Sequence, residues 1–267
     1  MWNFEHGPRS AELRNDFKID YTIPSRCAQM LAEGSGDIGI IPVAAYTTIP
    51  GLRVLPDVAI ASRGAVRSIL LISRRPMNEI RTVALDSSSR TSAALVQVLF
   101  RMKNLELTFA PAEPKLDGML STHDAALLIG DPALQVDRRQ YQTWDLAEEW
   151  RSLTGKPFVF AFWAVREDAA PEEELSQVAE VFRESRDEGL RHILEIADEW
   201  SPKLSISQDG VLSYLKDNIH YYLDAESISG MKLFFELAAF YGVLPRAPEL
   251  RLVPELAFRN STHQSRV

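Results

Sequence analysis

The feature that most constrains the fold is an alternation of short apolar runs with segments of helical periodicity, which continues as far as Arg166. Short apolar runs bounded by Gly, Pro and polar residues are typical of strands, and apolar residues three and four apart are typical of amphipathic helices. Strands that alternate with helices predict parallel sheets with right-handed crossovers. After Arg166 only helical spacing remains, so the sequence predicts an α/β fold with a helical C-terminal third.

The expected elements follow this pattern along the chain. We expect strands at 17–23, 37–41, 54–62, 67–74, 81–85, 106–111, 125–130 and 158–166. We expect helices from about Ser25, after Pro42, over 90–102, from Asp131, and over 143–155, where Gly155 ends the helix. The helical third is expected at 171–200, 210–223 and 227–241.

Two long strands, 68–73 and 158–165, bracket a self-contained α/β block. A compact block inserted between two strands predicts two lobes that are joined by two crossings of the chain. We expect lobe I to contain 1–74 and 164–267, and lobe II to contain 75–163. Both lobes should have mixed sheets flanked by helices, and the cleft between them is the natural place for a ligand.

Composition narrows the functional class. Of the 267 residues, 46% are apolar and 25% are charged, which is typical of a globular protein with a sizeable core. The net charge of −8 argues against a nucleic-acid partner, which normally requires a basic stripe. No apolar run reaches the roughly 20 residues that span a bilayer, and MWNFEHGPRSAELRND lacks the basic and apolar regions of a secretory signal. We therefore expect no nucleic-acid partner and no membrane partner.

Several familiar motifs are absent or out of context. Cys27 is the one cysteine, which excludes a disulfide framework or a cysteine zinc cluster and favours a reducing, cytoplasmic setting. It lies in a predicted helix, where a small buried residue is expected. GSGDIG at 34–39 follows a helix and precedes a strand, the reverse of a dinucleotide fingerprint, and TGKPF at 154–158 lacks the other residues of a phosphate loop.

The block DSSSRTS at 86–92 is the strongest candidate site. It joins the end of a strand to the start of a helix, where the first N–H groups lack partners within the helix and carry the positive end of its dipole. The residues of this predicted anion site are Ser87, Ser88, Ser89, Arg90, Thr91 and Ser92. The arginine can bind a carboxylate through two hydrogen bonds. One hydroxyl would suffice as a helix cap, so five within six positions favour an anion site over a capping run.

Two further strand-to-helix junctions repeat this arrangement. DIGIIPVAAY contains Pro42, and LLIGDPAL contains Asp131, a good helix cap, followed by Pro132 at the expected first helical position. Three such junctions can face one cleft, and a small dicarboxylate suits them. Ser68, at the start of a strand that crosses between lobes, can also reach this cleft, although an ordinary strand serine is the alternative.

The histidines are scattered along the sequence. His123 stands beside Asp124 just before a buried strand, so it could serve as an acid or a base. A surface or capping role is favoured, because most histidines of a folded protein have such roles.

Five segments carry a resemblance to a known family. They are GDIGIIPVAAY, SILLISR, VALDSSSRTSAAL, AALLIGDPAL and DLAEEWRSLTGKPFVFAFWAVR. In this order and spacing the chain resembles the chorismate dehydratases of the futalosine route to menaquinone, over nearly its whole length from Trp2. LLIGDPAL and TGKPFVFAFWA together are the most specific part of the resemblance.

The resemblance implies a two-lobed, periplasmic-binding-protein-like type II fold that acts as a lyase. The implied reaction removes water from chorismate to give 3-[(1-carboxyvinyl)oxy]benzoate, with no metal or organic cofactor. The hydroxyl-rich helix start would hold one carboxylate, and Ser68, in RSILLIS, would be a catalytic or substrate-orienting serine. The substrate's own enolpyruvyl carboxylate could act as the base. We expect chorismate as the partner and a monomer or weak homodimer.

The sequence departs from the family pattern at its N-terminus, and two alternative functions share this fold. Family members usually begin with a strand and a Phe-Leu-Asn type motif just before the segment that matches MWNFEHG, and the Asn is expected to line the active site. If this sequence is complete, we expect one sheet to lack a strand, an exposed edge, and impaired activity. The alternatives are a solute-binding protein on the same fold, and the related enzyme that makes dihydroxynaphthoate, which would use a cleft histidine such as His123.

Overall fold

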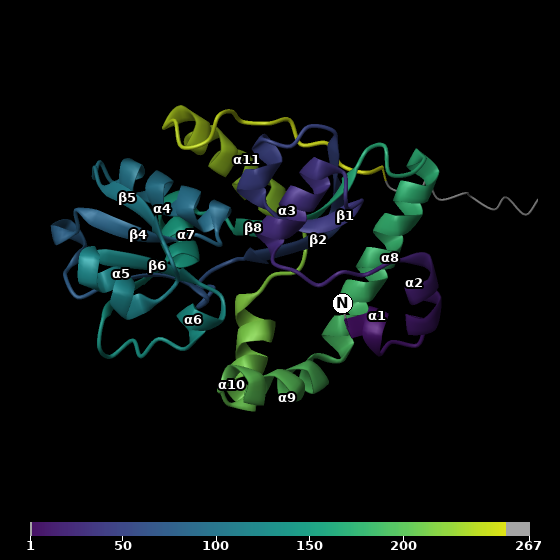
Figure 1. The fold of residues 1–267 in the computed structure, drawn as a ribbon, viewed down its shortest axis with the longest axis horizontal. Coiled ribbons are helices and arrows are strands. Elements are labelled where there is room, and N and C mark those ends of the chain that lie inside the picture. Colours follow the sequence, from purple (N-terminus) through teal and green to yellow (C-terminus); the bar gives the residue numbers. More distant parts are fainter. Residues whose placement is uncertain (1, 255–267) are drawn as a thin grey trace, which may run out of the picture.

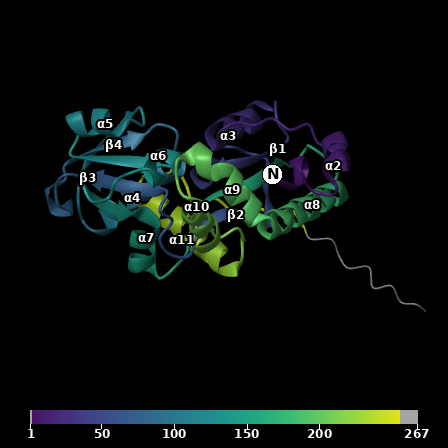
Figure 2. The ribbon, with the colours of Figure 1, turned by 90° about the horizontal axis from the view of Figure 1, so that it is seen from below.

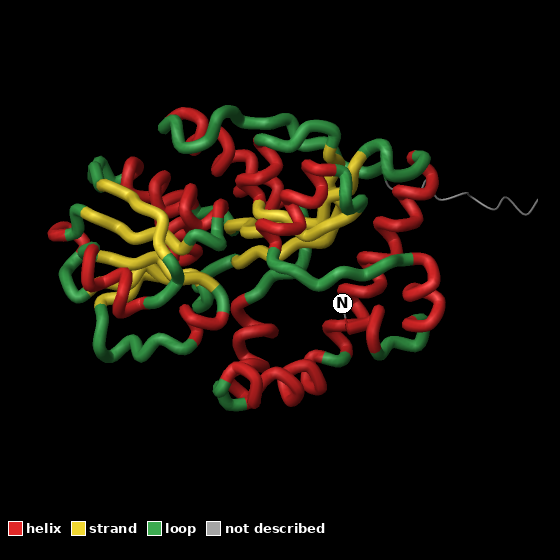
Figure 3. The backbone as a smooth tube through the Cα atoms, viewed as in Figure 1, coloured by secondary structure: helices red, strands yellow, loops and turns green. Residues whose placement is uncertain are grey.

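The computed structural model describes residues 2–254, which form two β-sheets surrounded by helices (Figures 1 and 3). The strands are β1 (Ile38–Pro42), β2 (Leu52–Ser62), β3 (Ile69–Ser73), β4 (Thr82–Asp86), β5 (Thr108–Ala112), β6 (Ala125–Ile129), β7 (Gln142–Asp145) and β8 (Phe158–Arg166). The α-helices are α1 (Trp2–Glu5), α2 (Ser10–Asp16), α3 (Pro24–Glu33), α4 (Arg90–Met102), α5 (Leu116–Thr122), α6 (Asp131–Leu134), α7 (Leu146–Thr154), α8 (Glu172–Arg191), α9 (Ile193–Leu204), α10 (Gln208–Ser213) and α11 (Ala225–Phe240). Two 3-10 turns cover Val43–Thr47 and Met77–Glu79, and a π-helical turn, called the π turn below, covers Tyr214–Asn218.

The two sheets lie side by side along the long axis of the molecule (Figures 1 and 2). The three-stranded sheet has the order β1-β8-β2, and both of its pairs are antiparallel. The five-stranded sheet has the order β5-β4-β6-β3-β7, in which β4 is parallel to β5 and β6 while β3 is antiparallel to β6 and β7. The prediction of mixed sheets is therefore correct for the five-stranded sheet, whereas parallel pairing occurs only among β4, β5 and β6. Helices α4 and α5 lie between these three strands along the chain, whereas the strand before β3 and the strand before β8 each belong to the other sheet.

The sheet pairing shows where the chain passes from one half to the other. It leaves the three-stranded sheet after Ser62 and joins the five-stranded sheet at Ile69. It leaves the five-stranded sheet after Asp145 and returns at Phe158. The expected lobes, 1–74 with 164–267 and 75–163, stay a prediction.

Three local expectations were wrong. Residues 17–23 alternate in polarity as a strand does, but they run as an extended segment without a strand partner among the described residues, and a strand forms only when a partner backbone is present. Residues 143–145 were expected to begin a helix but belong to β7, because four strand residues are too few to show a pattern. The helix expected over 210–223 ends at Asn218, after which His220 forms an isolated bridge with Ala61 of β2.

One hydrophobic core continues through both sheets, with Val54 of β2 and Leu71 of β3 in the same cluster. Trp150, Phe158 and Phe234 pack edge to face within it. Aromatic pairs of this geometry stabilise a core beyond the area they bury. This shared core fixes α7, β8 and α11 against one another.

The helical C-terminal third returns the chain to the middle of the molecule. α8 packs against β2 and α1, and α9 and α10 then lead to the π turn (Figure 1). Asn218 Nδ2, at the end of the π turn, donates a hydrogen bond to the Ala65 carbonyl at 2.9 Å. The π turn therefore contacts the segment that joins β2 to β3, directly before Ser68.

Candidate active site

One edge of the five-stranded sheet gathers several of the predicted site residues. β4 and β6 are parallel and both end there, and the antiparallel β3 begins there with Ile69 opposite Ile129. The Gly130 N–H donates to the Ser68 carbonyl at 2.8 Å, and the Ile129 N–H donates to Asp86 Oδ2 at 3.3 Å. Ser68 and the junctions that follow β4 and β6 therefore share one edge.

The hydroxyl block begins with a turn built around Asp86. This buried carboxylate accepts hydrogen bonds from the Ser88 N–H at 2.9 Å and the Ser88 hydroxyl at 2.6 Å. Ser89 is the cap of α4, since its hydroxyl oxygen accepts from the Ser92 N–H at 3.2 Å. Two of the five hydroxyls thus shape the turn itself, while Ser87 is exposed.

Thr91 joins the hydroxyl block to the three-stranded sheet. Its buried hydroxyl oxygen accepts a hydrogen bond from the Ala44 N–H at 3.2 Å, and its own proton stays available to another acceptor. Ala44 lies in the 3-10 turn that follows Pro42, the buried last residue of β1, where a longer helix was predicted. Direct hydrogen bonds therefore link all three predicted strand-to-helix junctions.

The exposed charges at these junctions differ in their surroundings. Arg90, the first residue of α4, is exposed and forms no hydrogen bond or ion pair with any described residue. Asp131 is exposed at the start of α6, and its side chain caps no N–H group. The prediction that Asp131 is the helix cap was wrong. Gly130 takes the cap position with φ 64°, a conformation that a residue with a Cβ atom rarely adopts.

Ser68 receives a hydrogen bond that the sequence did not predict. Ser68 is 5% exposed, and Tyr214 Oη donates a hydrogen bond to Ser68 Oγ at 3.0 Å. Burial raises the pKa of Tyr214, so the phenol keeps its proton at neutral pH. Tyr214 lies 146 residues away in a segment with ordinary helical periodicity, so no sequence signal could have marked it. A π-helical turn at this point is the structural signal, because such turns are frequent at functional sites.

His123 lies far from this edge of the sheet. It precedes β6, whereas Gly130 follows β6, so the length of the strand separates them by roughly 17–20 Å. Its Nδ1 is 2.9 Å from Thr122 Oγ1. The position favours the capping or surface role over the role of a base beside Ser68.

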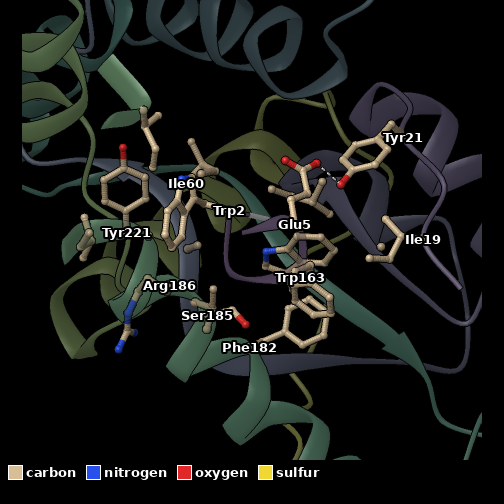
Figure 4. A pocket seen from close by; sticks show the side chains of 18 of the residues that line it. Trp2, Glu5, Ile19, Tyr21, Ile60, Trp163, Phe182, Ser185, Arg186 and Tyr221 are labelled. Carbon is tan, nitrogen blue, oxygen red and sulfur yellow. Dashed lines mark hydrogen bonds between the residues drawn. The ribbon is translucent and has the colours of Figure 1, made fainter. Parts of the chain in front are cut away.

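A groove of about 570 Å³ lies between the N-terminal segment, β1, β2, α8 and α9 (Figure 4). Its walls are mostly apolar and include Trp163 and Phe182, and the Tyr21 hydroxyl donates to the Glu5 carboxylate at one side. None of the predicted site residues lines it. Leu215, the neighbour of Tyr214 in the π turn, does line it.

Other functional groups are sparse in this part of the molecule. Cys27 also lines the groove, but burial raises the pKa of its thiol, the opposite of what a reactive cysteine requires. Within residues 2–254, no three His, Cys, Asp or Glu side chains lie close enough to share a metal ion. No helix in the same range is long and apolar enough to cross a membrane.

Solved structures with similar folds include binding proteins. A crystal structure of a protein from Archaeoglobus fulgidus matches with a TM-score of 0.63 and 16% identity, over 88% of this chain and 93% of that one. The periplasmic aliphatic sulphonate-binding protein SsuA from Escherichia coli matches with a TM-score of 0.61 and 14% identity, over 92% of this chain and 90% of that one. The predicted periplasmic-binding-protein-like fold is confirmed.

Sequence comparison is more specific. A chorismate dehydratase from Thermus thermophilus is 29% identical over 252 residues, which cover 87% of this chain and 89% of that protein. A family model described as menaquinone biosynthesis matches residues 2–240. Because this match spans most of the sequence, the chain belongs to the menaquinone biosynthesis family.

Proposed function

We propose that this protein is a chorismate dehydratase, a hydro-lyase that acts in menaquinone biosynthesis by the futalosine route. Its membership of the menaquinone biosynthesis family and its similarity to the Thermus thermophilus enzyme support the proposal. Three finer parts of the proposal are that no metal or organic cofactor takes part, that the enzyme is cytoplasmic, and that it is a monomer or weak homodimer.

The observation that carries the proposal is the convergence of three junctions and Ser68 on one region. Chorismate has two carboxylates and a ring hydroxyl. The start of α4, a helix of 13 residues, offers free N–H groups and the positive end of a dipole to one carboxylate. Arg90 is exposed at the same place and is free to pair with a carboxylate. The site is therefore suited to a small dicarboxylate.

The reaction needs a base for the ring proton and assistance for the departing hydroxyl. None of the residues named at the shared edge is a histidine, and the Asp86 carboxylate is already bound by Ser88 and Ile129, so we assign the proton to the substrate's enolpyruvyl carboxylate. As the ring C–H and C–O bonds break, the ring becomes aromatic. The carboxylate passes its proton to the departing hydroxyl, which leaves as water. The enzyme orients the substrate, and Ser68 donates a hydrogen bond to the oxygen that gains negative charge.

The alternatives predict different outcomes. A solute-binding protein would hold the dicarboxylate unchanged, as the fold alone would allow. The dihydroxynaphthoate-forming enzyme would need a cleft histidine, and His123 lies at the opposite end of β6 from Ser68. This position disfavours the second alternative.

Mass spectrometry of chorismate incubated with the protein tests the proposal. We expect a product lighter than chorismate by one water that co-elutes with 3-[(1-carboxyvinyl)oxy]benzoate. The heat-denatured protein is the control for spontaneous decay of chorismate. Binding of chorismate without any such product would contradict the dehydratase and favour the binding protein.

A further inference from the structure

The backbone directly before Ser68 is held in an unfavourable conformation. Arg67 has φ 66°, in the left-handed region that costs energy for a residue with a Cβ atom. The Asp145 carboxylate accepts hydrogen bonds from the Val66 N–H at 3.1 Å and from the Arg67 N–H at 2.6 Å. Arg138 Nη2 donates to the Arg67 carbonyl at 3.1 Å. Strain that the surroundings enforce in this way is typical of functional sites.

The π turn contacts the same segment at two points. Asn218, its last residue, donates to the Ala65 carbonyl at 2.9 Å. Tyr214, its first residue, donates to Ser68 Oγ at 3.0 Å. A single rare element therefore fixes both the backbone before Ser68 and the Ser68 side chain.

The contact with Tyr214 determines what the Ser68 hydroxyl can do. A serine hydroxyl has one proton to donate and lone pairs that accept. The phenol is the more acidic of the two hydroxyls and therefore the better donor, so Tyr214 occupies a lone pair of Ser68 Oγ and leaves the Ser68 proton free. No described residue accepts that proton, so it is available to a ligand.

We propose that Tyr214 is a positioning residue, which orients the Ser68 hydroxyl so that its proton points to the hydroxyl that chorismate loses. This inference rests on the proposed function. The departing oxygen gains negative charge as its C–O bond breaks, and a donor that is already oriented stabilises that charge without reorganisation. Tyr214 acts through Ser68 and needs no contact with the substrate.

Tyr214→Phe tests this role, because it keeps the partly buried ring and removes the donor. We expect kcat to fall about tenfold with KM within about twofold of the wild type, since an oriented donor acts mainly in the transition state. Tyr222→Phe is the matched control. Its ring lies beside Arg186, its hydroxyl has no partner among the described residues, and its kinetics should equal those of the wild type.

A double-mutant cycle separates positioning from a structural effect. In the Ser68→Ala background, Tyr214→Phe should lower kcat no further, because the hydroxyl that it orients is gone. A purely structural role would lower kcat equally in both backgrounds. Asn218→Ala provides a second test at the other end of the π turn, with kcat expected to fall about fivefold.

The outcomes distinguish this inference from the proposed function. If the wild-type protein does not dehydrate chorismate, both the proposed function and the positioning role are contradicted. If the wild type dehydrates chorismate, two results would contradict the positioning role alone. One is an unchanged kcat in Tyr214→Phe, and the other is a double mutant whose loss of kcat equals the product of the two single losses. The positioning role is supported if the double mutant has the same kcat as Ser68→Ala and the Tyr222→Phe control has the kcat of the wild type.

Discussion

At the scale of single residues, Arg90 is the cation best placed to bind a carboxylate. It is exposed at the first position of α4 and has no acidic partner among the described residues, so no residue in the described range 2–254 competes for its guanidinium. Arg90→Ala should raise the KM for chorismate about tenfold and change kcat less, because the lost bond is present in ground and transition states alike. Initial rates over a range of chorismate concentrations measure this. Equal KM values in Arg90→Ala and the wild type would contradict the anion site.

The residue types at the site were predictable, but their partners were not. The sequence placed five hydroxyls and one arginine at the junction before α4, and the structure confirms that this junction exists. The sequence could not show that Thr91 forms a hydrogen bond with Ala44, that Ser89 is the cap of α4, or that Tyr214 forms a hydrogen bond with Ser68. Each of these partners depends on how distant elements pack, which local patterns do not encode.

At the scale of elements, Gly230 of α11 packs against the backbone of Pro157, the residue directly before β8, so closely that only glycine fits. A Cβ atom at Gly230 would lie 2.1 Å from the Pro157 carbonyl oxygen. Gly230→Ala should therefore lower the free energy of unfolding by about 2 kcal/mol or more, because neither backbone can move without disturbing the core. Thermal unfolding measures the loss.

Gly189, in α8, is the matched control. A Cβ atom there meets nothing within 4 Å, so Gly189→Ala should stabilise the protein by about 0.5 kcal/mol through the helix preference of alanine. Similar unfolding temperatures for the two variants would contradict the close packing of α11 on β8.

The start of α11 predicts a dependence of stability on pH. Asp224 caps this helix by accepting from the Ser227 N–H at 2.8 Å, and it pairs with His220 at 2.8 Å and Arg63 at 2.6 Å. Burial raises the pKa of Asp224, but these hydrogen bonds outweigh it and hold the pKa below the usual range. A lowered folded pKa gives stability that is present above the unfolded pKa of about 3.9 and is lost as pH falls through the folded value.

Asp224→Asn keeps a good cap and removes the charge. It should lower the free energy of unfolding by about 1 kcal/mol at neutral pH, and the difference from the wild type should shrink below about pH 4. Thermal unfolding between neutral pH and pH 3 measures this. Asp217→Asn, an exposed aspartate without a partner among the described residues, should match the wild type throughout. A difference for Asp224→Asn that stays constant to pH 3 would contradict the assignment.

At the scale of the whole molecule, the order of elements was more predictable than their pairing. The apolar runs around Ile69–Ser73 and Ala125–Ile129 correctly marked strands, because buried strands of a central sheet are apolar on both faces. Their antiparallel register was not predictable, since it follows from the passage of the chain between the two sheets. The extended segment 17–23 shows the same limit, because strand periodicity does not supply a strand partner.

We propose above all that chorismate loses water where Ser68 and the junctions that follow β4 and β6 share one edge of the five-stranded sheet. The most direct test is the rate of chorismate dehydration by Ser68→Ala, with His123→Ala as the matched control at the other end of β6. We predict that Ser68→Ala lowers kcat at least about 100-fold while its unfolding temperature stays near that of the wild type, and that His123→Ala turns over normally. Normal turnover by Ser68→Ala, or loss of activity in His123→Ala alone, would contradict the account.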